Sequence, residues 1–191
     1  MGGMNPSVPS LAHHLLVAVP SLQQPPFTRS VTLVCQQDEK GAMGVVVNQP
    51  SEFTLGDVLS QLDISCTDAD LMAIPVLNGG PVHAERGFVI HDDPRPWAST
   101  LEVGQGLYLT TSRDILQSIA QGQGPDNAVV TLGCAGWGPG QLEQELMDNS
   151  WLAVPAGREI IFDVPLAQRW QAAAGLIGVD LSRLTDYSGR V

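Results

Sequence analysis

Residues 130–151 read VTLGCAGWGPGQLEQELMDNSW, and the succession of strand, glycine-rich turn and helix in this segment decides how the chain folds. The apolar residues that lead into it predict a strand over 127–134. The pattern that follows predicts a helix from Gln141 to about Asn149. Between the two, three glycines allow a sharp change of backbone direction, because glycine adopts backbone angles that other residues resist. These glycines are Gly136, Gly138 and Gly140.

Outward from this segment, hydrophobic periodicity predicts further strands and helices. The predicted strands lie within 14–20, 30–37, 43–49, 74–82, 86–92 and 158–165. The predicted helices are 54–64, one within 106–125 after a short strand, and one from Pro165 to about Ala174. Thr54 with Asp57, and Thr111 with Asp114, have capping-box spacing, and Asp163 could cap the last helix. Hairpins early in the chain and strand–helix pairs later predict an α+β domain with a mixed sheet.

The composition bounds the class of protein. The chain has 191 residues, so we expect a single domain over 13–191 after a flexible lead-in at 1–12. Nine Lys and Arg face twenty Asp and Glu, and the net charge of -11 opposes direct nucleic-acid binding. The three cysteines form no Cys-x-x-Cys pair, which favours reduced thiols in a cytoplasmic protein. No segment has the pattern of a signal peptide or a membrane span, so no membrane partner is expected.

Several blocks of sequence resemble one known family in their order and spacing. The blocks are VAVPSL, GAMGVVVNQP, GGPV followed by RGFVIH, LTTSRDIL, LGCAGWGPGQLEQEL and NSWLAVPA. Through them the chain is similar to the AlgH/YqgE family of bacterial proteins from about Leu15 to Leu184. The resemblance implies a single α+β domain with a bent, partly barrel-like mixed sheet and helices packed outside. It also implies a cytosolic protein with no established biochemical activity, and the family's regulator label is not evidence of DNA contact.

Two features depart from the family's pattern. Cys134 stands where members commonly have tyrosine, so a catalytic thiol does not carry over from the resemblance. The C-terminal TDYSGRV differs from the Gly-His-Ala tail associated with the family. Cys134 lies between a predicted strand and a helix, where thiolates are stabilised, but no basic neighbour in the sequence would activate it. A buried structural cysteine is therefore the favoured interpretation.

The glycine–tryptophan segment is the first candidate site. A helix N-terminus follows it and could bind an anion. However, Pro139 removes one donor, and Glu143 would repel a phosphate, so a structural turn is favoured over a binding surface or a phosphate cradle. Trp137 is either a plug on the core or an exposed stacking platform, and the usual burial of tryptophan favours the plug. The candidate binding residues here are Gly136, Trp137, Gly138, Gly140 and Glu145.

A second glycine loop, NGGPVHAER at 78–86, is the second candidate site. If it faces the Trp137 segment across the sheet edge, the two loops would form a polar cleft with an aromatic wall. A separation of more than about 15 Å would exclude a shared small ligand. The candidate binding residues of this loop are Asn78, Gly79, Gly80 and Arg86.

Thr111 and Ser112 complete the candidate binding residues. Ser112 could be a nucleophile, but the Gly-x-Ser-x-Gly elbow is absent and a helix-start serine is more often a cap. The four histidines lack the spacing of metal ligands. We therefore assign no catalytic residue, no metal and no cofactor.

Three classes of function stay open. The first is a binding or adaptor protein with an indirect regulatory role, acting through a protein partner or a small polar ligand. The second is an enzyme on a polar small molecule at the glycine-rich loops, with Ser112, Cys134, His83 or Glu145 assembled in space. The third is a direct DNA-binding regulator, which the net charge and the lack of a basic helix face oppose. We expect the first.

Overall fold

The computed structural model describes residues 11–25 and 27–188. Strand β9 (Ala128–Trp137) is the central strand of its sheet. It pairs antiparallel with β3 (Gly41–Val46) and β6 (Val82–His91). It also pairs in parallel with β5 (Pro75–Asn78). A single strand therefore joins both halves of the sheet, and it is the strand that begins the segment 130–151.

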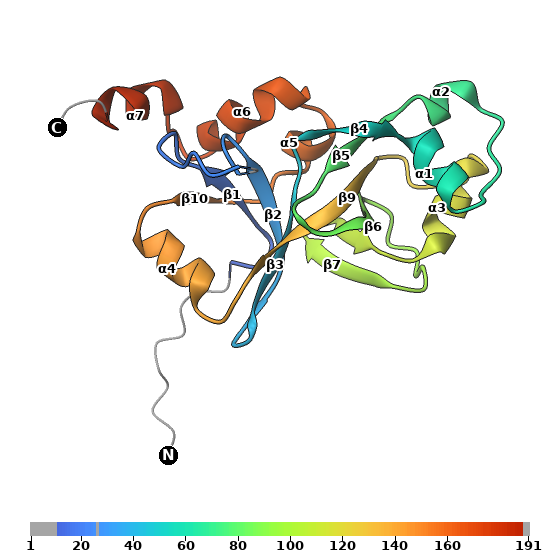
Figure 1. Ribbon diagram of the computed structural model, residues 1–191, viewed down its shortest axis with the longest axis horizontal. Helices are drawn as coiled ribbons and strands as arrows, with labels where there is room; N and C mark the ends of the chain where they lie inside the picture. The colour runs from blue at the N-terminus through green and yellow to red at the C-terminus, as the bar shows by residue number, and fades with distance from the viewer. Residues whose placement is uncertain (1–10, 26, 189–191) are drawn as a thin grey trace, which may run out of the picture.

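The other strands extend the sheet on both sides of β9 (Figure 1). The main path runs β10-β1-β2-β3-β9-β6-β8-β7, and β4 attaches through β5. The bounds are β1 (His14–Ala18), β2 (Val31–Asp38), β4 (Pro50–Thr54), β7 (Thr100–Gly104), β8 (Leu107–Thr110) and β10 (Trp151–Pro155). Among the described strands every pairing except β5–β9 is antiparallel. The sheet curls into a half-barrel, which confirms the predicted α+β domain with a bent mixed sheet.

Helices gather at both ends of this sheet (Figure 1). At one end lie α1 (Leu55–Gln61), α2 (Ala69–Met72) and α3 (Arg113–Ala120). Toward the other lie α4 (Gln141–Met147), α5 (Arg158–Phe162), the 3-10 helix η1 (Leu166–Gln168), α6 (Arg169–Gly175) and α7 (Leu181–Ser188). None of the helices in the described ranges has the length and apolar character to cross a membrane.

Three apolar clusters form the core, and β9 contributes to each. Cys134 packs in the cluster beneath α5 and α6. Val130 packs in the cluster beneath α1 and α3. Trp137 packs with Leu142 of α4 in the third, against which Leu11 also packs. The rest of the predicted flexible lead-in, residues 1–10, lies outside the described residues, as do residues 189–191 of the divergent tail.

The glycine-rich turn begins later than predicted. The strand predicted to end at Cys134 continues to Trp137, with Gly136 paired to Met43 and Trp137 to Ala42 of β3. Pairing with β3 satisfies the backbone there, and this outweighs the weak strand preference of glycine. The sharp turn comes at Gly140, where φ is 72°. Glycine at this position avoids the Cβ crowding that disfavours a positive φ.

The prediction of a strand at 158–165 is wrong, because residues Arg158–Phe162 form helix α5. The run contains two consecutive isoleucines, Ile160 and Ile161, which are both buried in the same cluster. Adjacent residues of a strand point to opposite faces, whereas adjacent residues of a helix can share one side. Tertiary packing therefore overrode the local β preference of the isoleucines.

Of the three helix caps predicted from the sequence, one is correct and two are wrong. The Thr54–Asp57 capping box is present, with both reciprocal hydrogen bonds made. Helix α3 begins after Ser112 rather than Thr111, so the Thr111–Asp114 box is wrong. Asp163 ends α5 instead of capping the last helix, whose predicted range η1 and α6 fill. The pattern missed the short elements β4, β7, β10 and α2, which have too few residues to establish a period.

Candidate functional site

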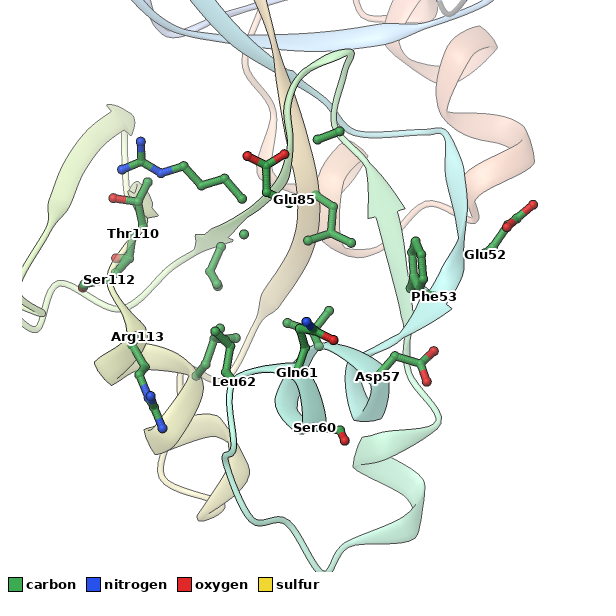
Figure 2. Close-up of a pocket in the computed structure, with 18 residues that line it drawn as sticks. Glu52, Phe53, Asp57, Ser60, Gln61, Leu62, Glu85, Thr110, Ser112 and Arg113 are labelled. Carbon is green, nitrogen blue, oxygen red and sulfur yellow. The ribbon is translucent and has the colours of Figure 1, made fainter.

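A cleft of about 1030 Å³ opens between helix α1, the start of α3 and the exposed half of strand β6. Figure 2 shows Thr110, Ser112 and Arg113 on one side of it and Phe53 on the other. Gln61 and Leu62, at the end of α1, point toward the centre of the cleft (Figure 2). The cleft therefore collects side chains from four separate parts of the chain, which no local sequence motif could reveal.

The floor of the cleft is apolar. Gly87 and Val89 of β6 and Leu132 of β9 line it, with Val58 and Leu116 on the flanking helices. A Cβ placed on Gly87 would meet no atom within 4 Å, so this glycine leaves the backbone of β6 open to the cleft. An open backbone above an apolar floor is the surface that an extended peptide can use.

Residues 83–86 of β6 have no ladder partner on the described strands. Pairing with β9 passes from Val82 directly to Gly87, and β8 pairs only with the stretch 89–91. Ala84, Glu85 and Arg86 are exposed along the cleft. Their backbone groups are therefore accessible to a partner that lies in the cleft.

Charged groups of both signs surround the apolar floor. Arg86 and Arg113 line the cleft, and within the described ranges neither forms an ion pair. Arg86 lies over the ring of Phe88, with its Cζ 5.8 Å from the centroid. Glu52 and Glu85 supply negative charge. Such a rim favours a ligand with polar groups of its own over a purely apolar one.

The cleft hydroxyl of Thr110 is engaged by a buried histidine. Nε2 of His91 lies 2.7 Å from Oγ1 of Thr110, while Nδ1 accepts from the backbone N–H of Asp93 at 3.1 Å. Burial lowers the pKa of His91 although Asp93 and Asp92 oppose the shift. A neutral imidazole whose Nδ1 accepts must carry its proton on Nε2, so His91 donates to Thr110. This arrangement holds the hydroxyl in place and does not activate it as a nucleophile.

Ser112, at the start of α3, is held by hydrogen bonds to Asp114 and to the backbone of Ser99. Its Oγ donates to Oδ1 of Asp114 at 2.5 Å and accepts from the N–H of Ser99 at 3.1 Å. Burial would raise the pKa of Asp114, but the hydrogen bonds from Ser112 and from the N–H groups of Ala98 and Ile115 outweigh it and the pKa is lowered. A carboxylate with a lowered pKa is a weak base, so this pair favours a positioning role.

Trp137 is buried, with 6% of its surface exposed, which makes it the plug and not a platform. Its Nε1 donates to Oε1 of Glu145 at 3.3 Å, and Nε1 of Trp151 donates to the same oxygen at 3.1 Å. The two indole rings meet edge to face with centroids 6.2 Å apart. Glu145 therefore joins α4 to two strands, and neither it nor Trp137 lines the cleft.

The Gly79–Gly80 turn packs against β9 at Leu132 and Cys134, before the glycine–tryptophan segment begins. The N–H of Gly79 donates to the carbonyl of Leu132 at 2.8 Å, and Oδ1 of Asn78 accepts from the N–H of Gly80. A Cβ on Gly80 would lie 2.3 Å from the carbonyl of Cys134. This contact is close backbone packing, and the hypothesised cleft between the two loops is absent from the described site: Gly79, Gly80 and Trp137 do not line it, and Trp137 faces the core.

Of the eleven candidate binding residues, the cleft collects Arg86, Thr111 and Ser112. The other eight lie elsewhere, in the Gly79–Gly80 contact or in the α4 region: Asn78, Gly79, Gly80, Gly136, Trp137, Gly138, Gly140 and Glu145. Sequence reasoning missed Gly87 and Leu62. The signal for Gly87 was a glycine inside a strand pattern, which often marks a close approach of another backbone.

The buried thiols of Cys35 and Cys134 are poor nucleophiles. Burial, with a contribution from Cys134, raises the pKa of Cys35 to about 12. Burial also raises the pKa of Cys134, against an opposing effect of Arg86. Both side chains are therefore protonated at neutral pH, and Cys134 is the buried structural cysteine that was favoured. No group of three or more potential metal ligands occurs in the described part of the chain.

Comparison with known proteins places the whole chain in one group. A family model described as AlgH-like matches residues 15–182. A UPF0301 protein of Stenotrophomonas maltophilia (strain K279a) is 71% identical over 182 residues, 95% of this chain and 97% of the relative. A UPF0301 protein of Xanthomonas campestris pv. campestris (strain B100) is 66% identical over 179 residues, 94% of this chain and 95% of that one.

Solved structures agree with this match. The solution structure of the AlgH protein from Pseudomonas aeruginosa covers 100% of both chains at 44% identity, with a TM-score of 0.79. A crystal structure of a protein from Corynebacterium diphtheriae has a TM-score of 0.73 at 20% identity and covers 96% of this chain and 94% of that one. The second likeness shows the shared fold alone.

Proposed function

The chain belongs to the AlgH-like family, and from that premise we propose that it is a binding protein whose cleft between α1, β6 and α3 takes an extended segment of a partner protein. In this role it is an adaptor, and any effect on gene expression is indirect. The observation that carries the proposal is the unpaired, exposed stretch 83–86 of β6 beside an apolar floor.

Three properties of the cleft support a peptide over a compact metabolite. Its volume of about 1030 Å³ is slightly above the roughly 300–1,000 Å³ usual for small-molecule sites. A free strand segment offers main-chain hydrogen bonds to any sequence, while pockets beside it select side chains. Phe53, 51% exposed at the rim, supplies the kind of aromatic contact on which protein interfaces depend.

The hydrogen bonds of the cleft favour binding over catalysis. The hydroxyl of Thr110 accepts a hydrogen bond from His91, and the hydroxyl of Ser112 donates one to Asp114, whose pKa is lowered. Neither hydroxyl has a base poised to remove its proton. The net charge of -11 continues to oppose direct DNA binding.

A random-peptide selection followed by affinity measurement tests the proposal. Peptides enriched by phage display on the purified protein are labelled, and their dissociation constants are measured by fluorescence anisotropy. Gly87→Val should weaken binding by about tenfold or more, or roughly 1.4 kcal/mol, because the new side chain occupies the cleft. The fold should tolerate it, since a Cβ at this position meets no other atom within 4 Å.

Gly136→Val is the matched control. Gly136 is likewise a strand glycine with room for a side chain, since its added Cβ would come no closer than 3.7 Å to Val82. It lies outside the cleft, so peptide affinity should stay within about twofold of that of the unaltered chain. If no peptide is enriched, or if Gly87→Val binds as well as Gly136→Val, the cleft is not a peptide site.

A further inference from the structure

A second hollow, of about 610 Å³, lies on the other side of α1, between the segment 71–77 and the turn that joins α5 to α6. Leu55 of α1, Leu71 and Ile74 line one side of it. Phe162 and Leu166 line the other. Its walls are mainly apolar, and it is separate from the peptide cleft because no residue lines both.

One cation is buried at this hollow. Arg169, the first residue of α6, lines the hollow and is only 7% exposed. Its Nε donates to the carbonyl of Val164 at 2.8 Å, and its Nη1 donates to the carbonyl of Val47 at 2.6 Å. Both acceptors are neutral, so the protein meets part of the hydrogen-bonding capacity of the guanidinium without neutralising its charge.

The charge of Arg169 has no counterion within the described residues. Arg95, Arg158 and Arg183 form ion pairs, and Arg169 does not. Burial lowers the pKa of Arg169, but guanidinium groups remain protonated in proteins. A buried charge without an opposite partner is costly, and natural proteins rarely keep one.

The N–H groups of Arg169 that have no described acceptor could bind an anionic ligand. A guanidinium has five N–H groups, and the described acceptors engage one on Nε and one on Nη1. The terminal nitrogens of arginine match the two oxygens of a carboxylate, a geometry that lysine does not reproduce. An anion that enters the hollow would receive hydrogen bonds and would neutralise the charge.

We propose that this hollow binds a small amphipathic carboxylate, whose head group pairs with Arg169 and whose apolar chain lies against Leu71, Ile74 and Phe162. The volume falls within the roughly 300–1,000 Å³ of typical small-molecule sites. Apolar walls around a single cation select a ligand that is both apolar and anionic. Asp126, which is exposed and also lines the hollow, disfavours ligands that carry a second negative charge.

Calorimetric titration with decanoate, below its micelle concentration, tests the proposal against two matched compounds. Decanol keeps the apolar chain without the charge, and acetate keeps the charge without the chain. Decanoate should bind at least about tenfold more tightly than either compound. No binding of decanoate, or equal binding of decanoate and decanol, overturns the proposal.

Two variants locate the site. Arg169→Lys keeps the charge but loses the paired donors, and it should weaken decanoate binding by about tenfold. Because Arg169 also holds two carbonyls, Ile74→Glu provides an independent test. Ile74 is 46% exposed, so glutamate is tolerated there and places a repelling carboxylate at the hollow.

Ile177→Glu is the control for the second variant. Ile177 is 44% exposed, carries the same substitution and lies outside the hollow, so decanoate affinity should stay within about twofold of the unaltered chain's. Gly87→Val, which blocks the peptide cleft, should likewise leave decanoate binding unchanged. Undiminished binding in Arg169→Lys or Ile74→Glu, or a loss in Gly87→Val, contradicts the assigned site.

Discussion

At the scale of single residues, a few polar side chains hold the curled sheet together by serving two elements at once. Glu145 of α4 accepts hydrogen bonds from Trp137 of β9 and Trp151 of β10 through one oxygen. His91 connects β6 to Thr110 of β8 and to the loop at Asp93. Glu145 satisfies two buried donors, and His91 donates to a buried hydroxyl and accepts from a backbone N–H, so removing either side chain takes a hydrogen bond from each partner.

Replacing Glu145 should therefore destabilise the protein. Glu145→Ala leaves the indole N–H groups of two tryptophans, 6% and 3% exposed, without an acceptor. Each buried unsatisfied donor costs about 1–3 kcal/mol, so the free energy of unfolding should fall by roughly 2 kcal/mol or more. Urea denaturation followed by tryptophan fluorescence measures the loss.

Two further substitutions make the Glu145 prediction specific. Glu145→Gln retains a side-chain oxygen and should recover most of the stability. Gln144→Ala, on the exposed side of the same helix, should change it by less than about 0.5 kcal/mol. A loss in Gln144→Ala as large as that in Glu145→Ala would mean that helix propensity, and not the indole contacts, sets the effect.

His91 should make the protein less stable in mild acid. Burial lowers its pKa in the folded state below the unfolded value of 6.5. As the pH falls below 6.5, the unfolded chain takes up a proton that folded His91 resists, so the free energy of unfolding decreases. Above that pH both states are neutral, and His91 contributes no pH dependence.

Denaturation at pH 7.5 and pH 5.5 checks this sign. The carboxylates with lowered pKa, Asp93, Asp114 and Asp180, lose their contribution only at lower pH, below their ordinary value of 3.8. His91→Gln should therefore reduce the difference between the two conditions, while the exposed His83→Gln serves as the control. A pH dependence that is the same in His91→Gln and in the unaltered chain would show that other groups cause it.

At the scale of elements, backbone contact between the Gly79–Gly80 turn and β9 locks the two halves of the sheet. The carbonyl of Gly79 accepts from the N–H of Val46 in β3, and its N–H donates to Leu132 in β9. Gly80 has φ +146°, and its missing side chain lets the turn approach Cys134. This contact is possible only for glycine, because a Cβ would overlap the backbone of β9.

Two glycine-to-alanine substitutions should consequently have opposite effects. Gly80→Ala places a Cβ only 2.3 Å from the carbonyl of Cys134 on a backbone with positive φ, and it should cost more than about 2 kcal/mol. Gly175→Ala, at the end of α6 where a Cβ meets nothing within 4 Å, should stabilise by about 0.5–1 kcal/mol. Thermal or urea denaturation compares the two, and a neutral Gly80→Ala would contradict the close contact.

The elements also show which parts of the fold the sequence could predict. The helix at α1 was predictable because its capping box and its apolar spacing agree. Helix α5 was not, since its isoleucines favour a strand locally and only packing against the core selects a helix. Arg86, Thr111 and Ser112 were predicted for the cleft, but Gly87 and Leu62 join them only through tertiary folding.

At the scale of the whole molecule, one strand organises the core and one helix separates two hollows. β9 contributes to all three apolar clusters and so connects the cores of both sheet halves. Helix α1 places Val58 in the peptide cleft and Leu55 in the hollow that holds Arg169. Both proposed sites therefore depend on the end of the molecule where α1, α2 and α3 gather (Figure 1).

A ¹H–¹⁵N NMR titration of the labelled protein with a peptide selected on it shows directly whether the cleft between α1, β6 and α3 binds that peptide. We expect the largest amide shift changes at Ala84 to Gly87, at Leu62 and at Arg113, which border the cleft. Changes concentrated instead at Gly138 to Gln141, in the turn before α4, would contradict this expectation and would return the binding surface to the glycine–tryptophan segment.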